Sequence, residues 1–349
     1  MAKLRVGVIF GGKSGEHEVS LVSGKAVLAN LDRRKYSVTP ILIPRKGLWR
    51  VKGKPLRSVW MTLDRLDVVV PILHGPYGED GTIQGMLELI GVPYVGAGVL
   101  GSAVGMDKDV MKRLFQIAGL PQVEYVCVRA RDWAARPPLV GRPRGGRAAE
   151  KLRLMEGLEA KLRYPMFVKP ANLGSSVGIS KVHARAELAP AMDLAAEYDE
   201  KIVVEQGVEA RELECAVLGN DEPEASILGE VISGNEFYDY AAKYQDAGSR
   251  TIAPAPVPAA TAKEAQKLAV RAFQAVECRG MARVDFFVEK ASGRLLLNEI
   301  NTIPGFTPIS MYPKLWDASG LPFPRLLDRL IELALEHAAA TKRLRSVLP

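Results

Sequence analysis

Residues 283–301 contain two strand-like runs on either side of a short turn at residues 290–294. Gly293 lies in this turn, and glycine readily adopts the positive φ angles that tight hairpin connections require. The segment therefore predicts a β-hairpin, in which two neighbouring strands of a sheet run antiparallel.

The alternation of side chains along this hairpin gathers polar groups on one face. If the strands pair symmetrically about the turn, Asp285 lies opposite Glu299, Arg283 lies opposite Asn301, and Phe287 shares their face. Two carboxylates and an amide oxygen suit a hard cation such as Mg²⁺ or Mn²⁺. An arginine beside them suits anionic charge, as in phosphoryl transfer. The alternative is an ordinary solvated face, and a β-bulge would shift the register by one residue.

The chain has 349 residues, enough for two or three domains that each have a core. No apolar run approaches the roughly 20 residues that cross a membrane, and the N-terminus leads into a strand pattern without signal-peptide architecture. Cys127, Cys215 and Cys278 lie far apart and lack metal-binding spacing. A reducing cytoplasm is therefore the expected compartment.

The formal net charge of +7 could indicate a nucleic-acid partner, so its distribution matters. Residues 129–163 carry a net charge of +6, the tail from Ala338 carries +3, and the remainder carries −2. The basic segments are not interleaved with aromatic residues, as a nucleic-acid track would be. We expect neither a nucleic-acid nor a membrane partner.

Strand and helix patterns alternate through the first hundred residues. The predicted strands are Leu4–Phe10, Val38–Ile43 and Leu66–Leu73, and the predicted helices are residues 19–31 and 81–91. This alternation predicts a parallel sheet with ligand-binding loops at the carboxyl ends of its strands. Glu18 and His74 both lie just beyond such ends.

The patterns divide the chain into three predicted domains, residues 1–100, 101–204 and 205–349. The second begins with a helix over Asp109–Ala118 and contains a strand over Tyr164–Lys169. Between them, Arg136–Arg147 is rich in proline, glycine and arginine, which predicts an exposed surface insertion. The third predicted domain is strand-rich and ends in helical patterns. Together, the three domains predict an α/β fold class with α+β elements.

Several segments could bind a nucleotide. Gly174–Gly178 is a Gly/Ser loop after the strand that ends in Lys169, and such loops can cradle phosphates, although the P-loop spacing is absent and a plain turn is the alternative. Lys108 and Lys169 could bind phosphates. Glu205 and Glu212, at a junction between strands, suit the adenine amino group and ribose hydroxyls, or form a solvated hinge.

Two further segments suit a closing active site. Residues 237–244, with sequence Phe-Tyr-Asp-Tyr-Ala-Ala-Lys-Tyr, predict a loop that could close over a ligand, or a surface excursion. Gly305 follows a proline and permits a backbone N–H to approach an oxyanion.

In their order along the chain, these motifs resemble the D-alanine–D-alanine ligase family of the ATP-grasp enzymes. The resemblance covers nearly the whole chain and rests on residues 16–20, 74–81, 174–178, 238–244 and 283–306. It implies a three-domain ATP-grasp fold with an N-terminal parallel-sheet domain, and ATP held between the central and C-terminal domains.

The resemblance also implies roles for individual residues. ATP would be bound by Lys108, Lys169, Ser175, Ser176, Glu205, Val208, Glu212, Lys243, Phe287 and Asn298. Two Mg²⁺ (or Mn²⁺) ions would be bound by Asp285, Glu299 and Asn301, with Glu299 bridging. The D-alanine side would be formed by Glu18, Ser175 and Tyr244 as a hydrogen-bonded triad, His74 beside the first substrate, Ser310 and Met311 at the second carboxylate, and Arg283 and Gly305 at the oxyanion.

The implied activity is ATP-dependent ligation of two D-alanines through a D-alanyl phosphate, for peptidoglycan precursor synthesis in the cytoplasm, by a homodimer. A D-alanine–D-lactate or D-alanine–D-serine ligase is the alternative, and Tyr244 favours the dipeptide product because depsipeptide-forming relatives tend to alter this loop. A catalytically silent ATP-binding module is disfavoured, since the residues of the hairpin face and Lys243 are intact.

Overall fold

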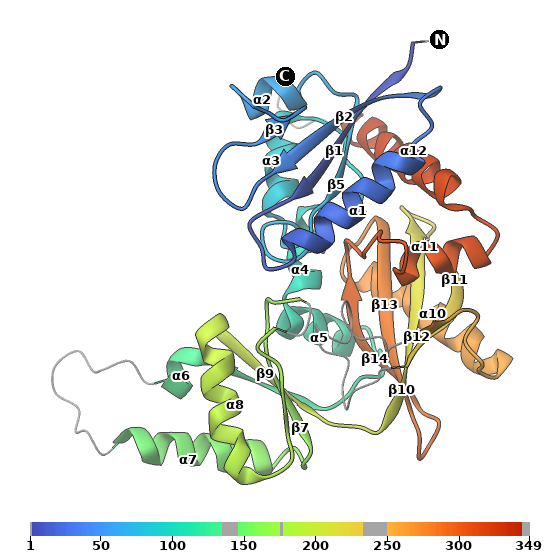
Figure 1. Cartoon of the computed structure of the whole chain (residues 1–349). Helices are drawn as coiled ribbons and strands as arrows, with labels where there is room; N and C mark the ends of the chain where they lie inside the picture. Colours follow the sequence, from blue (N-terminus) through green and yellow to red (C-terminus); the bar gives the residue numbers. More distant parts are fainter. Residues whose placement is uncertain (1, 135–145, 175–176, 233–249, 344–349) are drawn as a thin grey trace.

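The computed structural model describes residues 2–134, 146–174, 177–232 and 250–343. Within these ranges the chain forms three β-sheets with helices packed on their faces (Figure 1). None of the helices in these ranges has both the length and the apolar composition needed to cross a bilayer.

The N-terminal sheet is parallel at its centre, as the strand–helix alternation predicts. Its strand order is β4-β3-β2-β1-β5, in which β2, β1 and β5 run parallel and the short β3 and β4 form an antiparallel edge. The strands are β1 (Leu4–Gly11), β2 (Tyr36–Ile43), β3 (Arg50–Val51), β4 (Lys54–Pro55) and β5 (Val68–Ile72). The helices of this part are α1 (His17–Asn30), α2 (Val59–Leu63) and α3 (Thr82–Ile90).

The central sheet is antiparallel, with the strand order β6-β9-β7-β8. Its strands are β6 (Tyr125–Arg129), β7 (Met166–Pro170), β8 (Ser180–Val182) and β9 (Lys201–Gln206). The surrounding helices are α4 (Val99–Met106), α5 (Lys108–Ile117), α6 (Ala130–Ala134), α7 (Gly146–Glu159) and α8 (Arg185–Tyr198). Figure 1 shows α6, α7 and α8 together on one side of β7 and β9.

The third sheet is also antiparallel, with the order β12-β11-β10-β13-β14. Its strands are β10 (Ala210–Gly219), β11 (Glu224–Ile232), β12 (Arg250–Ile252), β13 (Gly280–Glu289) and β14 (Leu295–Asn301). Its helices are α10 (Ala259–Ala275), α11 (Met311–Ala318) and α12 (Phe323–Lys342).

The predicted domain boundaries fall inside secondary-structure elements. Residue 100 lies within α4, and residue 205 lies within β9. Gly101, in α4, lets the helix pack closely against the segment before β13, because a Cβ at this position would lie 2.8 Å from the carbonyl oxygen of Glu277. The close approach of α4 to the segment before β13 therefore depends on a glycine that sequence patterns treat as a helix breaker.

The hairpin has the predicted register at the end that carries the polar face. Arg283 pairs with Asn301 and Asp285 pairs with Glu299, but Phe286 pairs with Leu297. A β-bulge at Asn298 causes this shift, and two consecutive residues of β14, Asn298 and Glu299, contribute to the same groove.

Helix α12 returns to the N-terminal sheet and joins the two ends of the chain (Figure 1). Asp328, which is 6% exposed, accepts hydrogen bonds from the Lys35 ammonium at 2.6 Å and from the Tyr36 hydroxyl at 2.7 Å. Both partners lie at the start of β2, so one buried carboxylate connects β2 to α12.

Replacing Asp328 with alanine should lower the free energy of unfolding by about 1–3 kcal/mol, because it leaves a buried tyrosine hydroxyl without its acceptor. Urea unfolding followed by circular dichroism measures the change. Glu336→Ala is the matched control, since Glu336 is exposed on the same helix and pairs only with Arg329 among the described residues. Equal losses in the two variants would contradict the role of Asp328.

Candidate active site

A groove of about 730 Å³ lies between the central and third sheets. The predicted residues that line it are Lys169, Glu205, Val208, Glu212, Arg283, Asp285, Phe287, Asn298 and Glu299. They come from β7, β9, β10, β13, β14 and the segment between β9 and β10. The fold therefore gathers most of the predicted nucleotide and metal residues in one place.

Glu205 is held between two lysines at one wall of the groove. Its Oε2 lies 2.6 Å from Lys169 Nζ, and its Oε1 lies 3.0 Å from Lys112 Nζ. Burial would raise the pKa of Glu205, but the two ammonium groups outweigh burial and lower that pKa below its usual value. Glu205 therefore presents a carboxylate, which accepts hydrogen bonds and cannot donate them.

Lys112 was not predicted as a site residue. It is 0% exposed and lies on α5, four residues after the predicted Lys108. This i, i+4 spacing places both lysines on one face of a helix, and is the sequence signal that could have identified it.

Arg283 lies at the centre of an anionic cluster on the third sheet. Its guanidinium donates two hydrogen bonds of 2.7 Å to Asp285 and lies 3.2 Å from Glu214 Oε2. Burial alone would lower the pKa of Arg283, yet Asp285 and Glu214 raise it well above its usual value. A permanent cation thus lies beside Asp285, and Glu214 is a partner that the sequence interpretation missed.

The predicted metal ligands lie around Arg283 at the end of the hairpin. Asp285 and Glu299 are cross-strand neighbours, Glu299 Oε2 lies 4.0 Å from Lys108 Nζ, and Asn301 Oδ1 accepts from the Ile303 amide at 3.2 Å. No group of three or more His, Cys, Asp or Glu that could bind a metal occurs in the described part of the chain.

A cation would therefore need the amide oxygen of Asn301 and oxygens from a ligand besides the two carboxylates. Asn298 Oδ1, which is buried and has no hydrogen-bond partner among the described residues, lines the same groove. Oxygen donors of this kind fit a hard divalent cation, so the residues present fit Mg²⁺ or Mn²⁺.

His74 connects the N-terminal sheet to the loop after β14. Its Nδ1 donates to the Ile303 carbonyl at 3.1 Å, and its Nε2 lies 3.0 Å from Ser23 Oγ. Ser23 Oγ also accepts from the Phe306 amide at 3.2 Å. Because the carbonyl can only accept, Nδ1 carries a proton, and when the ring is neutral Nε2 accepts from Ser23. Ser23 is thus a third residue, after Lys112 and Glu214, that the sequence interpretation missed. Burial would lower the pKa of His74, but Glu79, whose Oε1 lies 3.5 Å from Nδ1, raises it.

The structure places Glu18 away from the other candidates. Its side chain is 68% exposed in the first turn of α1, and its nearest cation is Arg45 at 3.6 Å. Glu16, the residue at the N-cap of α1, points toward the site instead, since a Cβ on Gly75 or Gly174 would lie 2.5 or 3.0 Å from its Oε2. The structure therefore brings Glu16, rather than the predicted Glu18, toward the other candidates, because the helix begins one residue before Glu18 and turns Glu18 to solvent.

The segment after β14 places the candidates for the second substrate. Ser310 Oγ accepts from the Thr307 amide at 3.0 Å and contacts Thr307 Oγ1 at 2.7 Å. A Cβ on Gly305 would lie 2.6 Å from Ser310 Oγ, so only glycine fits beside this hydroxyl. Met311 is buried and its methyl group packs against Gly229, which leaves its backbone as the candidate contact.

Some predicted residues lie outside the described part of the chain. They are Ser175, Ser176, Lys243 and Tyr244, together with the loop at residues 237–244 and most of the insertion at residues 136–147.

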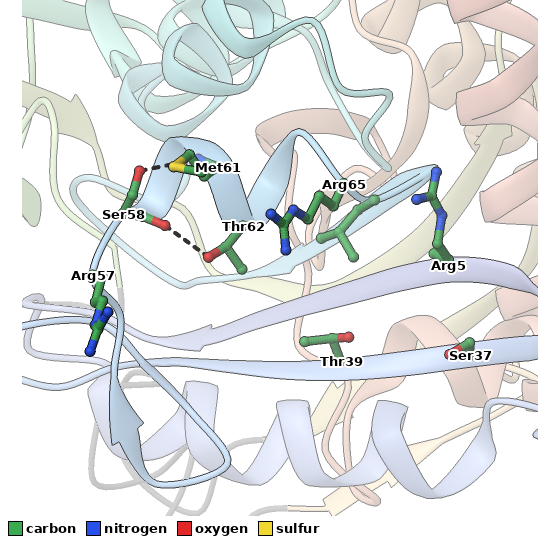
Figure 2. A pocket seen from close by; sticks show the side chains of 9 residues that line it. Arg5, Ser37, Thr39, Arg57, Ser58, Met61, Thr62 and Arg65 are labelled. Carbon is green, nitrogen blue, oxygen red and sulfur yellow. Dashed lines mark hydrogen bonds between the residues drawn. The ribbon is translucent and has the colours of Figure 1, made fainter.

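A second hollow, of about 570 Å³, lies on the N-terminal sheet beside α2. Figure 2 shows Arg5 and Arg57 at opposite ends of it, and Ser58 hydrogen-bonded to Met61 and Thr62 within α2. Arg5 is already paired with Asp67 at 2.6 Å. The polar groups of this second hollow lie far apart or are paired with near neighbours. The groove between the central and third sheets is therefore the stronger candidate for the active site.

Glu79 beside His74 predicts pH-dependent stability. Burial raises the pKa of Glu79 from 4.5 to about 7, so the folded chain keeps a proton that the unfolded chain releases between these values. Its contribution to stability is therefore present at low pH and is lost as the pH rises to about 7. Since one pKa unit corresponds to about 1.4 kcal/mol, the loss is on the order of 1–3 kcal/mol.

Glu79→Gln should remove this dependence, which urea unfolding between pH 5 and pH 8 measures. Glu264→Gln, at an exposed position on α10, is the control and should keep the pH slope of the parent protein. A Glu79→Gln variant with an unchanged slope would rule out a protonated Glu79.

Comparisons with known proteins agree on one family. The family model for the "D-ala D-ala ligase C-terminus" matches residues 114–332, and that for the "D-ala D-ala ligase N-terminus" matches residues 5–63 and 56–97. The chain is 49% identical to the D-alanine–D-alanine ligase of Thermoanaerobacter sp. (strain X514), over 96% of this chain and 98% of the relative.

Two solved structures resemble the whole chain. The D-alanine–D-alanine ligase of Coxiella burnetii is 37% identical with a TM-score of 0.79, and the alignment covers 98% of this chain and 96% of that one. The VanG D-Ala:D-Ser ligase of Enterococcus faecalis is 36% identical with a TM-score of 0.82, covering 95% of this chain and 100% of that one.

Proposed function

Since the chain belongs to the D-alanine–D-alanine ligase family of ATP-grasp enzymes, we propose that the groove between its central and third sheets binds ATP. The enzyme joins two D-alanines to D-alanyl-D-alanine at the expense of ATP, for peptidoglycan precursor synthesis. The observation that carries the proposed site is the convergence of Lys169 and Glu205 with Asp285 and Glu299 in one groove.

The base and ribose of ATP bind at the end of the groove formed by β9 and the start of β10. The Glu205 carboxylate accepts from the adenine amino group, Phe287 and Val208 form an apolar wall, and Glu212 accepts from the ribose hydroxyls. Lys169 and Lys108, with Ser175, Ser176 and Lys243, bind the phosphates.

Asp285, Glu299 and Asn301 would hold the Mg²⁺ or Mn²⁺ ions, of which we expect two. When bound, such ions neutralise charge on the phosphate oxygens. Asn298, whose Oδ1 has no hydrogen-bond partner in the described part of the chain, adds a polar atom to this end of the groove.

The first D-alanine binds beside His74, with its ammonium at Glu16, so that its carboxylate faces the γ-phosphate of ATP. A carboxylate is a poor electrophile, and transfer of the γ-phosphoryl group converts it to an acyl phosphate. The free amine of the second D-alanine, held through its carboxylate by Ser310 and the Met311 backbone, then attacks the acyl carbon. Phosphate leaves as the peptide bond forms.

Arg283 and the Gly305 N–H stabilise the oxyanion that forms during this attack. Arg283 suits this role because two carboxylates keep it charged and oriented in a buried position. The predicted closing loop at residues 237–244 lies outside the described residues, and its expected role is to exclude water that would hydrolyse the acyl phosphate.

Phosphate release from ATP in the presence of D-alanine, with mass analysis of the product, tests the function. We expect D-alanine-dependent release and a D-alanyl-D-alanine product, with L-alanine inactive. Release that is independent of D-alanine, or no release, would contradict the proposal.

A second candidate is a D-alanine–D-serine ligase, because the VanG structure matches the chain with a TM-score of 0.82, while the structures of a D-alanine–D-alanine ligase and of a D-alanyl-alanine synthetase match it with 0.79 and 0.82. Adding D-serine or D-lactate together with D-alanine distinguishes the candidates. A D-alanine–D-serine or D-alanine–D-lactate ligase would form mainly the mixed product. The enzyme acts in the cytoplasm, where ATP is supplied, and as a homodimer, which sedimentation would test.

A further inference from the structure

Lys112 is a charged residue close to the groove to which the proposed reaction gives no role. Its side chain is 0% exposed and does not line the groove, yet its Nζ lies 3.0 Å from Glu205 Oε1. It therefore reaches the Glu205 carboxylate from the side of α5, while Lys169 reaches the other oxygen at 2.6 Å.

The surroundings of Lys112 leave Glu205 as its main electrostatic partner. Among the described residues, neither Lys112 Nζ nor Glu205 Oε1 has a hydrogen bond of good geometry, and the nearest aromatic ring is Tyr125, with its centroid 5.4 Å from Nζ. A buried ammonium is costly unless an anion compensates it. Lys112 and Glu205 are thus coupled: each is the group that makes the burial of the other tolerable.

The sheet fixes the direction in which Glu205 points. Glu205 pairs with Tyr125 on β6 and with Phe167 on β7, so these three side chains form a row across one face of the central sheet. Lys169 is two residues from Phe167 and shares that face. The Glu205 carboxylate therefore contacts Lys112 of α5 on one side and faces the groove on the other.

We propose that Lys112 is a positioning residue that holds the Glu205 carboxylate as a fixed acceptor, and so makes the groove select purines with an amino group at position 6. The inference rests on the proposed binding of ATP in this groove. It adds a specificity determinant that does not itself touch the nucleotide.

The selection follows from hydrogen-bond chemistry. Adenine presents an amino donor at position 6, whereas guanine and hypoxanthine present a carbonyl acceptor there. A carboxylate opposite a carbonyl brings two acceptors together, and such a mismatch is rejected strongly because buried polar groups remain unpaired. Without Lys112, Glu205 has one cation left, and it can rotate toward Lys169 or take up a proton and become a donor.

Steady-state kinetics with ATP and ITP test the proposal, because ITP carries the 6-oxo base and the same triphosphate. In Lys112→Met, we expect the ratio of kcat/KM for ATP over ITP to fall about tenfold or more, with the KM for ATP raised and kcat at saturating ATP within about threefold of the parent. Methionine fills the space of the lysine stem, and thermal unfolding checks that the variant is folded.

Arg113→Met is the matched control, since Arg113 is the next residue on α5, is 61% exposed and pairs with Asp109. It removes one positive charge from the same helix and should keep the parent ratio. A folded Lys112→Met variant with the parent ATP:ITP ratio would overturn the proposal, because Lys112 would then be only a core residue.

If Lys112→Met does not fold, the double variant Lys112→Met/Glu205→Gln removes the uncompensated carboxylate and is compared with Glu205→Gln alone. Equal ATP:ITP ratios would support action through Glu205. A lower ATP:ITP ratio in the double variant than in Glu205→Gln would overturn the proposal. So would a double variant that does not fold while Glu205→Gln does. Parent protein that does not use ATP with D-alanine would refute the proposed function, whereas parent protein that uses ATP and ITP equally would refute only the inference.

Discussion

Replacing Glu299 with glutamine should lower kcat for D-alanine-dependent phosphate release by at least ~100-fold, on the scale of losing a principal charge-stabilising group. Glu299 is the cross-strand partner of Asp285 and lines the groove beside Lys108. Glutamine keeps the shape of the side chain and one acceptor oxygen, but it removes the charge that a divalent cation requires. A titration of Mg²⁺ at saturating ATP and D-alanine measures the effect.

Glu289→Gln is the matched control for this change. It makes the same substitution on the same hairpin, at a residue whose carboxylate hydrogen-bonds Ser292 and does not line the groove. Glu289→Gln should keep near-parental activity. Near-parental activity of Glu299→Gln at saturating Mg²⁺ would show that Glu299 does not bridge the ions.

Replacing Arg283 with methionine should affect both activity and stability. The variant leaves Asp285 and Glu214 as neighbouring, mostly buried carboxylates without their shared cation. Removing one partner of such a group costs about 3–5 kcal/mol of unfolding free energy. Loss of the oxyanion-stabilising charge should lower kcat at least ~100-fold. Urea unfolding and phosphate release measure the two effects.

Arg294→Met serves as the control, because Arg294 lies in the turn of the same hairpin and is 64% exposed. Its unfolding free energy and kcat should stay close to those of the parent. A second variant, Arg283→Lys, separates the two roles of Arg283, since lysine keeps the charge but cannot form the bidentate contact with Asp285. If Arg283→Lys recovers stability and kcat fully, the geometry of the guanidinium is not required.

The hairpin illustrates how far the fold can be predicted from the sequence. The pairing of Asp285 with Glu299 follows from the symmetry of two strands about a glycine-containing turn, and it is confirmed. The bulge at Asn298 could not be located, because Leu295, Leu296 and Leu297 are all buried and show no alternation from which to assign faces. The bulge is set by packing against other elements, which a single sequence does not specify.

The candidate site likewise contains residues that could be predicted from the sequence and residues that could not. Residues at strand ends, such as Lys169 and Glu205, could be predicted because local patterns locate the ends of strands. Glu16 could not, since its side chain reaches the site through tertiary contacts, and the only sequence signal for Lys112 is its i, i+4 spacing from Lys108. Glu16 and Glu18 illustrate the difficulty, because two acidic residues two positions apart look equivalent until the start of α1 is known.

We expect this chain to activate D-alanine as an acyl phosphate in the groove between its sheets. Ligation with D-alanine labelled with ¹⁸O in the carboxylate, followed by mass analysis of the released phosphate, tests this intermediate. In the proposed reaction one carboxylate oxygen leaves with the phosphoryl group, so the phosphate should carry one ¹⁸O per dipeptide formed. Unlabelled phosphate accompanying labelled dipeptide, or release of pyrophosphate, would contradict the account.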